Sequence, residues 1–125
     1  MPGDFVRSVG WLEAGHPYQR GPVPDEFLVS LKRHVAEAYQ FALSVGVHHC
    51  SLCPEGKAQA GKLNLMIPTS RLLYVAPELI VHYIEDHGYQ PPQEFIEAVL
   101  ACPEQESEEY MKLLEPFERN WASEG

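Results

Sequence analysis

"GVHHCSLCPEGK", residues 46–57, places two histidines directly before a Cys-x-x-Cys pair and a Pro-x-Gly-Lys turn directly after it. The two residues inside such a pair allow both sulfurs to face one zinc ion while backbone amides donate to them. Gly56 suits the turn that follows, and the ammonium group of Lys57 would offset thiolate charge. Cys50 and Cys53 therefore predict half of a tetrahedral zinc site.

The other half is expected from His82 and His87, because four intervening residues fall within the spacing of Cys2His2 sites. In an undistorted helix, however, these two side chains diverge by about 140°. Both reach one ion only if the last turn tightens or unwinds near Gly88. His48 therefore stays open as a replacement for one of them, and so does His49 beside it.

The expected role of the ion is structural. A site closed by four protein ligands stabilises a fold, whereas a catalytic zinc keeps one position open. Glu85 and Asp86 lie between the two histidines and could serve a zinc hydrolase as a base, but the pattern is not His-Glu-x-x-His. A thiol-disulfide oxidoreductase using Cys50 and Cys53 is the alternative, although the pair follows a helix and so lacks the helix N-terminus that lowers a thiol pKa.

Length and composition favour one domain, residues 1–125, with an ordinary hydrophobic core, since 45% of the residues are hydrophobic. The net charge of −9 disfavours nucleic acid and anionic membranes as partners. The chain has no apolar run of membrane-spanning length, and its first residues lack the features of a signal peptide. We therefore expect a cytoplasmic protein, in which three cysteines argue against a disulfide framework.

The chain pattern predicts an α+β fold, with a short antiparallel hairpin beside four to five helices around a zinc knuckle. Residues 1–24 are expected to form a Gly- and Pro-rich arm that packs through Trp11, Leu12 and Tyr18. Apolar spacing by threes and fours predicts a helix from Asp25 to a stop at Gly46. Two alternating apolar runs around a polar turn predict the hairpin, with strands over Leu63–Ile67 and Leu72–Val75.

Three further helices are expected after the hairpin. Pro77 suits the first position of a helix over residues 77–87, and Gly88 suits its C-terminal cap. A short helix follows Pro92, and the last helix begins after Ser107 as its N-cap. Pro116 should kink or split that helix.

The C-terminal segment, residues 103–125, is strongly acidic, with seven glutamates against Lys112 and Arg119. It is either a solvated helix face or a docking surface for a basic protein partner. The remaining polar candidates are ordinary: His16 and His34 are expected at the surface or in packing, and Cys102 as a small buried residue.

The motifs resemble those of a family of small uncharacterised bacterial proteins. The first shared pattern is Gly-x-His-x-Cys-x-x-Cys, and the second is a His-Tyr-x-x-x-His-x-Tyr-x-Pro-Pro segment ending in Phe95; residues 10–28 resemble the family's opening as well. The resemblance implies no activity, and it places His48 with His82 and His87 among the candidate ligands. A noncatalytic, zinc-stabilised binding or adaptor domain is therefore the expected function. The matching positions are Gly46, His48, Cys50, Cys53, Val81, His82, Tyr83, His87, Tyr89, Pro91, Pro92 and Phe95.

Overall fold

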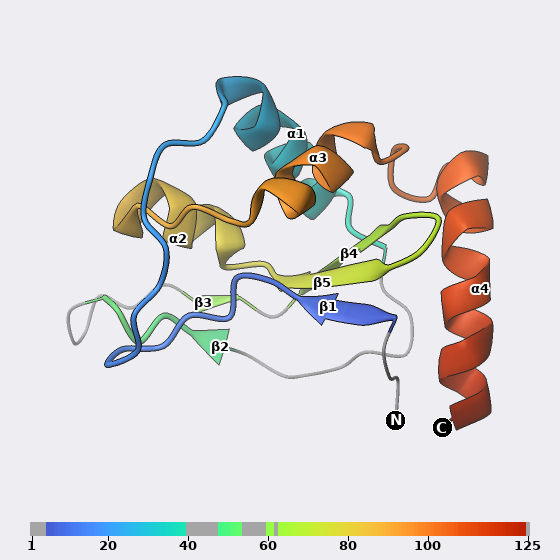
Figure 1. Ribbon diagram of the computed structural model, residues 1–125, viewed down its shortest axis with the longest axis horizontal. Coiled ribbons are helices and arrows are strands. Elements are labelled where there is room, and N and C mark those ends of the chain that lie inside the picture. The colour runs from blue at the N-terminus through green and yellow to red at the C-terminus, as the bar shows by residue number, and fades with distance from the viewer. Residues whose placement is uncertain (1–4, 40–47, 54–59, 62, 125) are drawn as a thin grey trace.

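The computed structural model describes residues 5–39, 48–53, 60–61 and 63–124; for His48, Ala60 and residues 120–124 only the backbone is described. This part of the chain forms four helices, a three-stranded sheet and a two-stranded ladder, so the expected small α+β fold is confirmed (Figure 1). In chain order, the elements are β1 (Val6–Ser8), α1 (Asp25–Ala36), β2 (His48–His49), β3 (Ala60–Gly61), β4 (Asn64–Pro68), β5 (Leu73–Pro77), α2 (Ile80–His87), α3 (Gln93–Ala101) and α4 (Glu108–Glu124).

The predicted hairpin is present as β4 and β5, which pair antiparallel from Asn64 opposite Pro77 to Pro68 opposite Leu73. Its turn is held by Thr69, whose hydroxyl oxygen accepts hydrogen bonds from two backbone N–H groups of the turn. Pro77 was expected to begin a helix, and this is wrong. It ends β5 instead, because the next residue, Glu78, continues the hairpin by donating its N–H to the carbonyl of Leu63 at 2.8 Å.

The N-terminal arm contributes a strand that the sequence pattern did not predict. β1 pairs parallel with β5, in the sheet order β1-β5-β4. Three residues are too few to show an alternating pattern, so only the distant partner reveals this strand. The arm packs through Leu12 and Tyr18 as expected, whereas 40% of the surface of Trp11 is exposed.

The two faces of the hairpin pack against different helices (Figure 1). Successive strand residues point to opposite faces, so Leu65 and Ile67 join a cluster with α1, α2 and α3, whereas Met66 faces α4. The second cluster comprises Met66, Leu73, Val75, Tyr110, Leu114 and Phe117. Both strands are buried along their whole length, which makes the hairpin the centre of the described structure.

Two helix boundaries differ from expectation. The first helix ends at Ala36 rather than near Gly46, because the chain turns away and the N–H of Tyr39 donates to the side-chain oxygen of Gln105 at 2.9 Å; Gly46 itself lies outside the described residues. The last helix begins as predicted, with the hydroxyl of Ser107 accepting from the N–H of Tyr110. It continues through Pro116, so of the two expected effects of this proline, a kink or a split, the split is wrong.

Within the described part of the chain, no helix combines the length and the apolar character that a membrane crossing requires.

Candidate metal centre

Four side chains meet at one point between the Cys-x-x-Cys loop and α2. The sulfurs of Cys50 and Cys53 and the ring nitrogens of His82 and His87 all lie within 4.8 Å of one another. Sulfur-to-Nε2 distances are 3.4 Å from Cys50 to His87, 3.2 Å from Cys53 to His82 and 3.6 Å from Cys53 to His87. The two Nε2 atoms lie 3.2 Å apart.

These separations match the edges of a zinc tetrahedron. With Zn–S bonds of about 2.3 Å and Zn–N bonds of about 2.0–2.1 Å, a tetrahedral ion separates sulfur from nitrogen by about 3.6 Å and two nitrogens by about 3.3 Å. The group is therefore compatible with one bound metal ion.

The loop that carries the cysteines is held at its ends by short backbone pairings. His48 pairs with Gly61 and His49 with Ala60, which forms the β2–β3 ladder. From the arm, the N–H of Ala14 donates to the hydroxyl of Ser51 at 2.8 Å. These contacts hold the loop against α2 from two directions.

The Cys50 sulfur is buried, with 1% of the residue's surface exposed. Burial raises the pKa of the Cys50 thiol, and hydrogen bonds from the backbone N–H groups of Leu52 and Cys53 oppose that rise. Amides that donate to the first sulfur are the feature expected of a metal knuckle, because they stabilise the thiolate that a metal ion requires.

The end of α2 explains how His82 and His87 converge. An α-helix would bond the N–H of Gly88 to residue 84, but here it donates to the carbonyl of Tyr83, five residues back. A turn closed by an i→i−5 bond holds more residues than an α-turn, so His87 falls closer to the side that carries His82. Gly88, at φ +68°, then ends the helix in the left-handed conformation that glycine favours. The last turn of α2 is thus widened. This is the unwinding near Gly88 that the spacing of His82 and His87 required as the alternative to a tightened turn.

Asp86 orients one of the two histidines. Its Oδ2 lies 3.0 Å from Nδ1 of His82, on the side of the ring that faces away from the cluster. A proton on Nδ1 that is donated to this carboxylate leaves the lone pair of Nε2 free for a metal ion. From the sequence, Asp86 was expected only as a possible base; its i,i+4 spacing from His82 was the signal for this contact.

Burial favours the neutral form of His87, which is the form that a metal ligand requires. Burial lowers its pKa, and the neighbouring His82 acts in the same direction. Its backbone carbonyl accepts a hydrogen bond from the hydroxyl of Tyr18 at 2.9 Å. The arm therefore contacts this end of the cluster as well.

Among the described side chains, the other candidate residues do not belong to the cluster. His49 is exposed, and the candidate His48 has its side chain outside the described residues. Lys32 pairs with Glu85, with 2.6 Å between Nζ and Oε2. His34, expected at the surface or in packing, is buried in a separate contact with Gln105.

Comparison with known proteins gives one match. A family model described as Domain of unknown function (DUF7919) matches residues 2–100. The matched range contains all four residues of the cluster and ends before α4. No curated protein and no solved structure matches the chain.

Proposed function

Because the chain belongs to the DUF7919 family, whose description names no activity, we propose a function from the cluster itself. The protein is a single zinc-stabilised domain of the cytoplasm that binds a partner or ligand and catalyses no reaction. Cys50, Cys53, His82 and His87 hold the ion. The observation that carries this proposal is the set of four ligand atoms spaced as the corners of a zinc tetrahedron.

The donor set supports zinc over other metals. Two thiolates and two imidazoles in a tetrahedral arrangement suit zinc, whereas calcium and magnesium prefer oxygen ligands. The geometry also favours a structural ion, because four protein ligands complete its coordination and leave no position for water. The carboxylates that a zinc hydrolase would need are engaged elsewhere, Asp86 with His82 and Glu85 with Lys32.

The thiol-disulfide alternative is disfavoured by the setting of Cys50. A redox nucleophile needs an accessible thiol with a lowered pKa. Here burial raises the pKa of the Cys50 thiol, and only 1% of the residue is exposed. The pair suits metal binding better than attack on a disulfide.

Metal analysis tests the proposal directly. Protein purified without added zinc should contain about one zinc ion per chain. Removal of the ion with a chelator should lower the melting temperature, since structural zinc contributes its binding free energy to folding, about 10–16 kcal/mol in zinc-finger peptides. Circular dichroism during heating, with and without chelator, provides the measurement. A metal-free sample that melts like the zinc-loaded protein would overturn the structural role.

The fourth ligand is tested by two matched substitutions. Loss of a residue that hydrogen-bonds to a metal ligand weakens metal binding about 10- to 100-fold, and loss of a ligand itself should weaken it more. His82→Ala should therefore reduce both the zinc content and the zinc affinity by more than this. His48→Ala should leave the zinc content and the zinc affinity unchanged. Zinc per chain and competition with a chromophoric chelator provide the readout. The opposite result, with zinc lost in His48→Ala and retained in His82→Ala, would assign the fourth position to His48.

The acidic helix α4 is the proposed surface for a basic protein partner. Two of its ion pairs, Lys112 with Glu108 and Arg119 with Glu115, are internal and exposed, so they contribute little to stability. The helix lies beyond the residues that the family model matches.

A further inference from the structure

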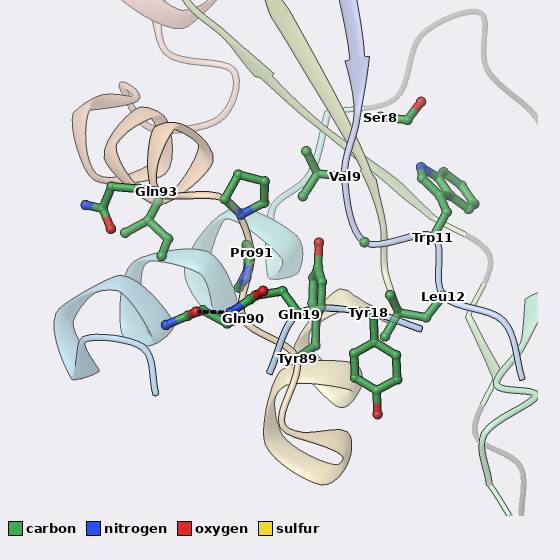
Figure 2. Close-up of a pocket in the computed structure, with 13 residues that line it drawn as sticks. Ser8, Val9, Trp11, Leu12, Tyr18, Gln19, Tyr89, Gln90, Pro91 and Gln93 are labelled. Atoms are coloured by element: carbon green, nitrogen blue, oxygen red, sulfur yellow. Dashed lines mark hydrogen bonds between the residues drawn. The ribbon is translucent and has the colours of Figure 1, made fainter. Parts of the chain in front are cut away.

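A cavity of about 710 Å³ lies between the N-terminal arm and the segment that follows α2 (Figure 2). Its size falls within the range of small-molecule sites. Although the chain carries a net charge of −9, none of the thirteen lining residues has a charged side chain. The lining therefore offers no partner for a phosphate, a carboxylate or a cation, and it suits an uncharged ligand.

One wall presents a flat apolar surface. Figure 2 shows Trp11 and Leu12 on one side of the cavity, Pro91 on the other and the ring of Tyr89 between them. Trp11 is 40% exposed, which is unusual for the largest apolar side chain of the arm. An indole ring in this position can cover the C–H face of a ligand.

The cavity also contains polar groups with unused hydrogen-bonding capacity. The hydroxyl of Tyr89, on a residue that is only 7% exposed, accepts from the backbone N–H of Gly10, so its own proton remains to be donated. Gln19 and Gln93 use their amide nitrogens for bonds within the protein. Neither of their side-chain oxygens accepts a hydrogen bond from a described residue. A ligand must therefore supply at least two donors and one acceptor.

We propose that this cavity binds an uncharged saccharide. The C–H face of a pyranose ring lies against Trp11, sugar hydroxyls donate to the side-chain oxygens of Gln19 and Gln93, and the hydroxyl of Tyr89 donates to a sugar oxygen. A saccharide supplies many O–H donors without charge, whereas a nucleoside or a short peptide supplies fewer. This inference rests on the proposed function, since it names the ligand class of the binding domain.

The walls of the cavity are attached to the metal centre. The hydroxyl of Tyr18 donates to the carbonyl of His87, and the N–H of Gly21 donates to the carbonyl of Gly88 at 3.2 Å. The N–H of Gln90 donates to the carbonyl of Gln19 at 3.0 Å. A bound metal ion that fixes His87 therefore also fixes the arm that carries Trp11 and Gln19.

The test is a titration of the full, zinc-loaded chain with neutral sugars, namely glucose, galactose, mannose, N-acetylglucosamine, maltose and cellobiose. At least one should shift the indole and backbone amide signals of the cavity in a saturable manner in NMR spectra. Trp11→Ala should weaken that binding about 10-fold, and Tyr89→Phe about 2- to 10-fold. Leu100→Ala, which removes an exposed apolar side chain of α3, and Tyr74→Phe, at a tyrosine that is also 7% exposed, are the matched controls and should bind as the wild type does.

Three results would overturn the saccharide proposal: no saturable shift with any of the six sugars, unchanged affinity in Trp11→Ala, or tighter binding of adenosine or the uncharged peptide N-acetyl-alanine amide. The zinc content of the same sample separates this failure from that of the proposed function. A zinc-loaded chain that binds no sugar contradicts the cavity proposal alone. A folded chain without zinc that binds sugar contradicts the structural zinc and supports the cavity proposal.

Discussion

The carboxylate of Asp86 determines which nitrogen of His82 can face a metal ion. Its side chain is 62% exposed, so the Coulombic energy of the contact is small, and its effect is mainly one of orientation. A neutral imidazole carries one proton, and placing that proton on Nδ1 reserves Nε2 for the cluster. The proposed set of metal ligands therefore depends on Asp86, which is not itself one of the ligands.

Replacement of this residue should weaken metal binding without unfolding the chain. Asp86→Ala is expected to lower zinc affinity about 10- to 100-fold, because His82 loses the acceptor that orients its ring. Competition with a chromophoric chelator measures the change. Glu85→Ala is the matched control, since it removes the adjacent carboxylate and the exposed contact with Lys32 but touches no cluster residue. Equal zinc affinities for the two variants would show that the Asp86 contact is incidental.

At the scale of the element, the last turn of α2 determines whether His82 and His87 can share one ion. The bond from Gly88 to Tyr83 widens the turn, and the left-handed conformation of Gly88 ends the helix directly after His87. A regular α-helix with the same sequence would direct the two rings about 140° apart. The position of the glycine is thus part of the candidate metal site.

Two glycine substitutions separate backbone strain from metal binding. Gly88→Ala and Gly15→Ala both place a side chain at positive φ, +68° and +89°, with no other atom within 4 Å of the new carbon. Each should reduce the free energy of unfolding by about 1 kcal/mol. Only Gly88→Ala should also weaken zinc binding, because only Gly88 sets the position of His87. Denaturant unfolding and chelator competition measure the two effects, and a loss of zinc affinity in Gly15→Ala would contradict this assignment.

Features governed by local rules could be predicted from the sequence. The Gly88 cap, the Ser107 cap and the hairpin turn each depend on residues within one turn of the chain, so their residue types are informative. The same holds for Cys50 and Cys53, whose spacing alone indicates a shared ion. These parts of the fold and of the site needed no knowledge of distant contacts.

Features that depend on distant contacts could not be predicted. β1 exists because β5 lies beside it, and the first helix stops early because Gln105 captures the N–H of Tyr39. Helical periodicity directs His82 and His87 about 140° apart, since it contains no information about the Cys-x-x-Cys loop that covers His82. The approach of that loop leaves the His82 side chain only 12% exposed.

For the whole molecule, a buried polar contact joins segments that are far apart in the sequence. The side-chain nitrogen of Gln105 lies 3.3 Å from Nδ1 of His34 in α1 and 3.5 Å from the carbonyl of Met66 in β4. The hydroxyl of Tyr110 in α4 donates to that same carbonyl at 2.8 Å. Since the amide nitrogen of Gln105 is a donor, Nδ1 of His34 accepts only while the imidazole is neutral.

Stability should therefore fall in mildly acidic solution. Burial lowers the pKa of His34 below its usual 6.5, and Arg33 acts in the same direction, while the Val99 carbonyl, Glu37 and Glu104 oppose the shift. The unfolded chain then takes up a proton before the folded chain does, so stabilisation that is complete above pH 6.5 is lost as the pH falls below that value. The measurement is the free energy of unfolding between pH 7.5 and 5, in the wild type and in His34→Gln.

The variant provides the control for the metal ligands. The four residues of the cluster are the same in both proteins, so any effect of acid on metal binding cancels in the difference. The difference in free energy of unfolding between the wild type and His34→Gln should therefore shrink as the pH decreases. If the free energies of unfolding of the two proteins changed in parallel with pH, His34 would not be the group that makes stability depend on pH in this range.

The pairing of β1 with β5 has a consequence for biosynthesis. Val6 lies opposite Leu73, more than half of the chain away, and the contacts from the arm to His87 and Gly88 span a similar stretch. Translation at about 5–20 residues per second delays the partner of β1 by several seconds. During that interval the segment of β1 can already emerge from the ribosome. Its partner β5, the two histidines of α2 and the cavity wall that follows α2 have not yet been synthesised.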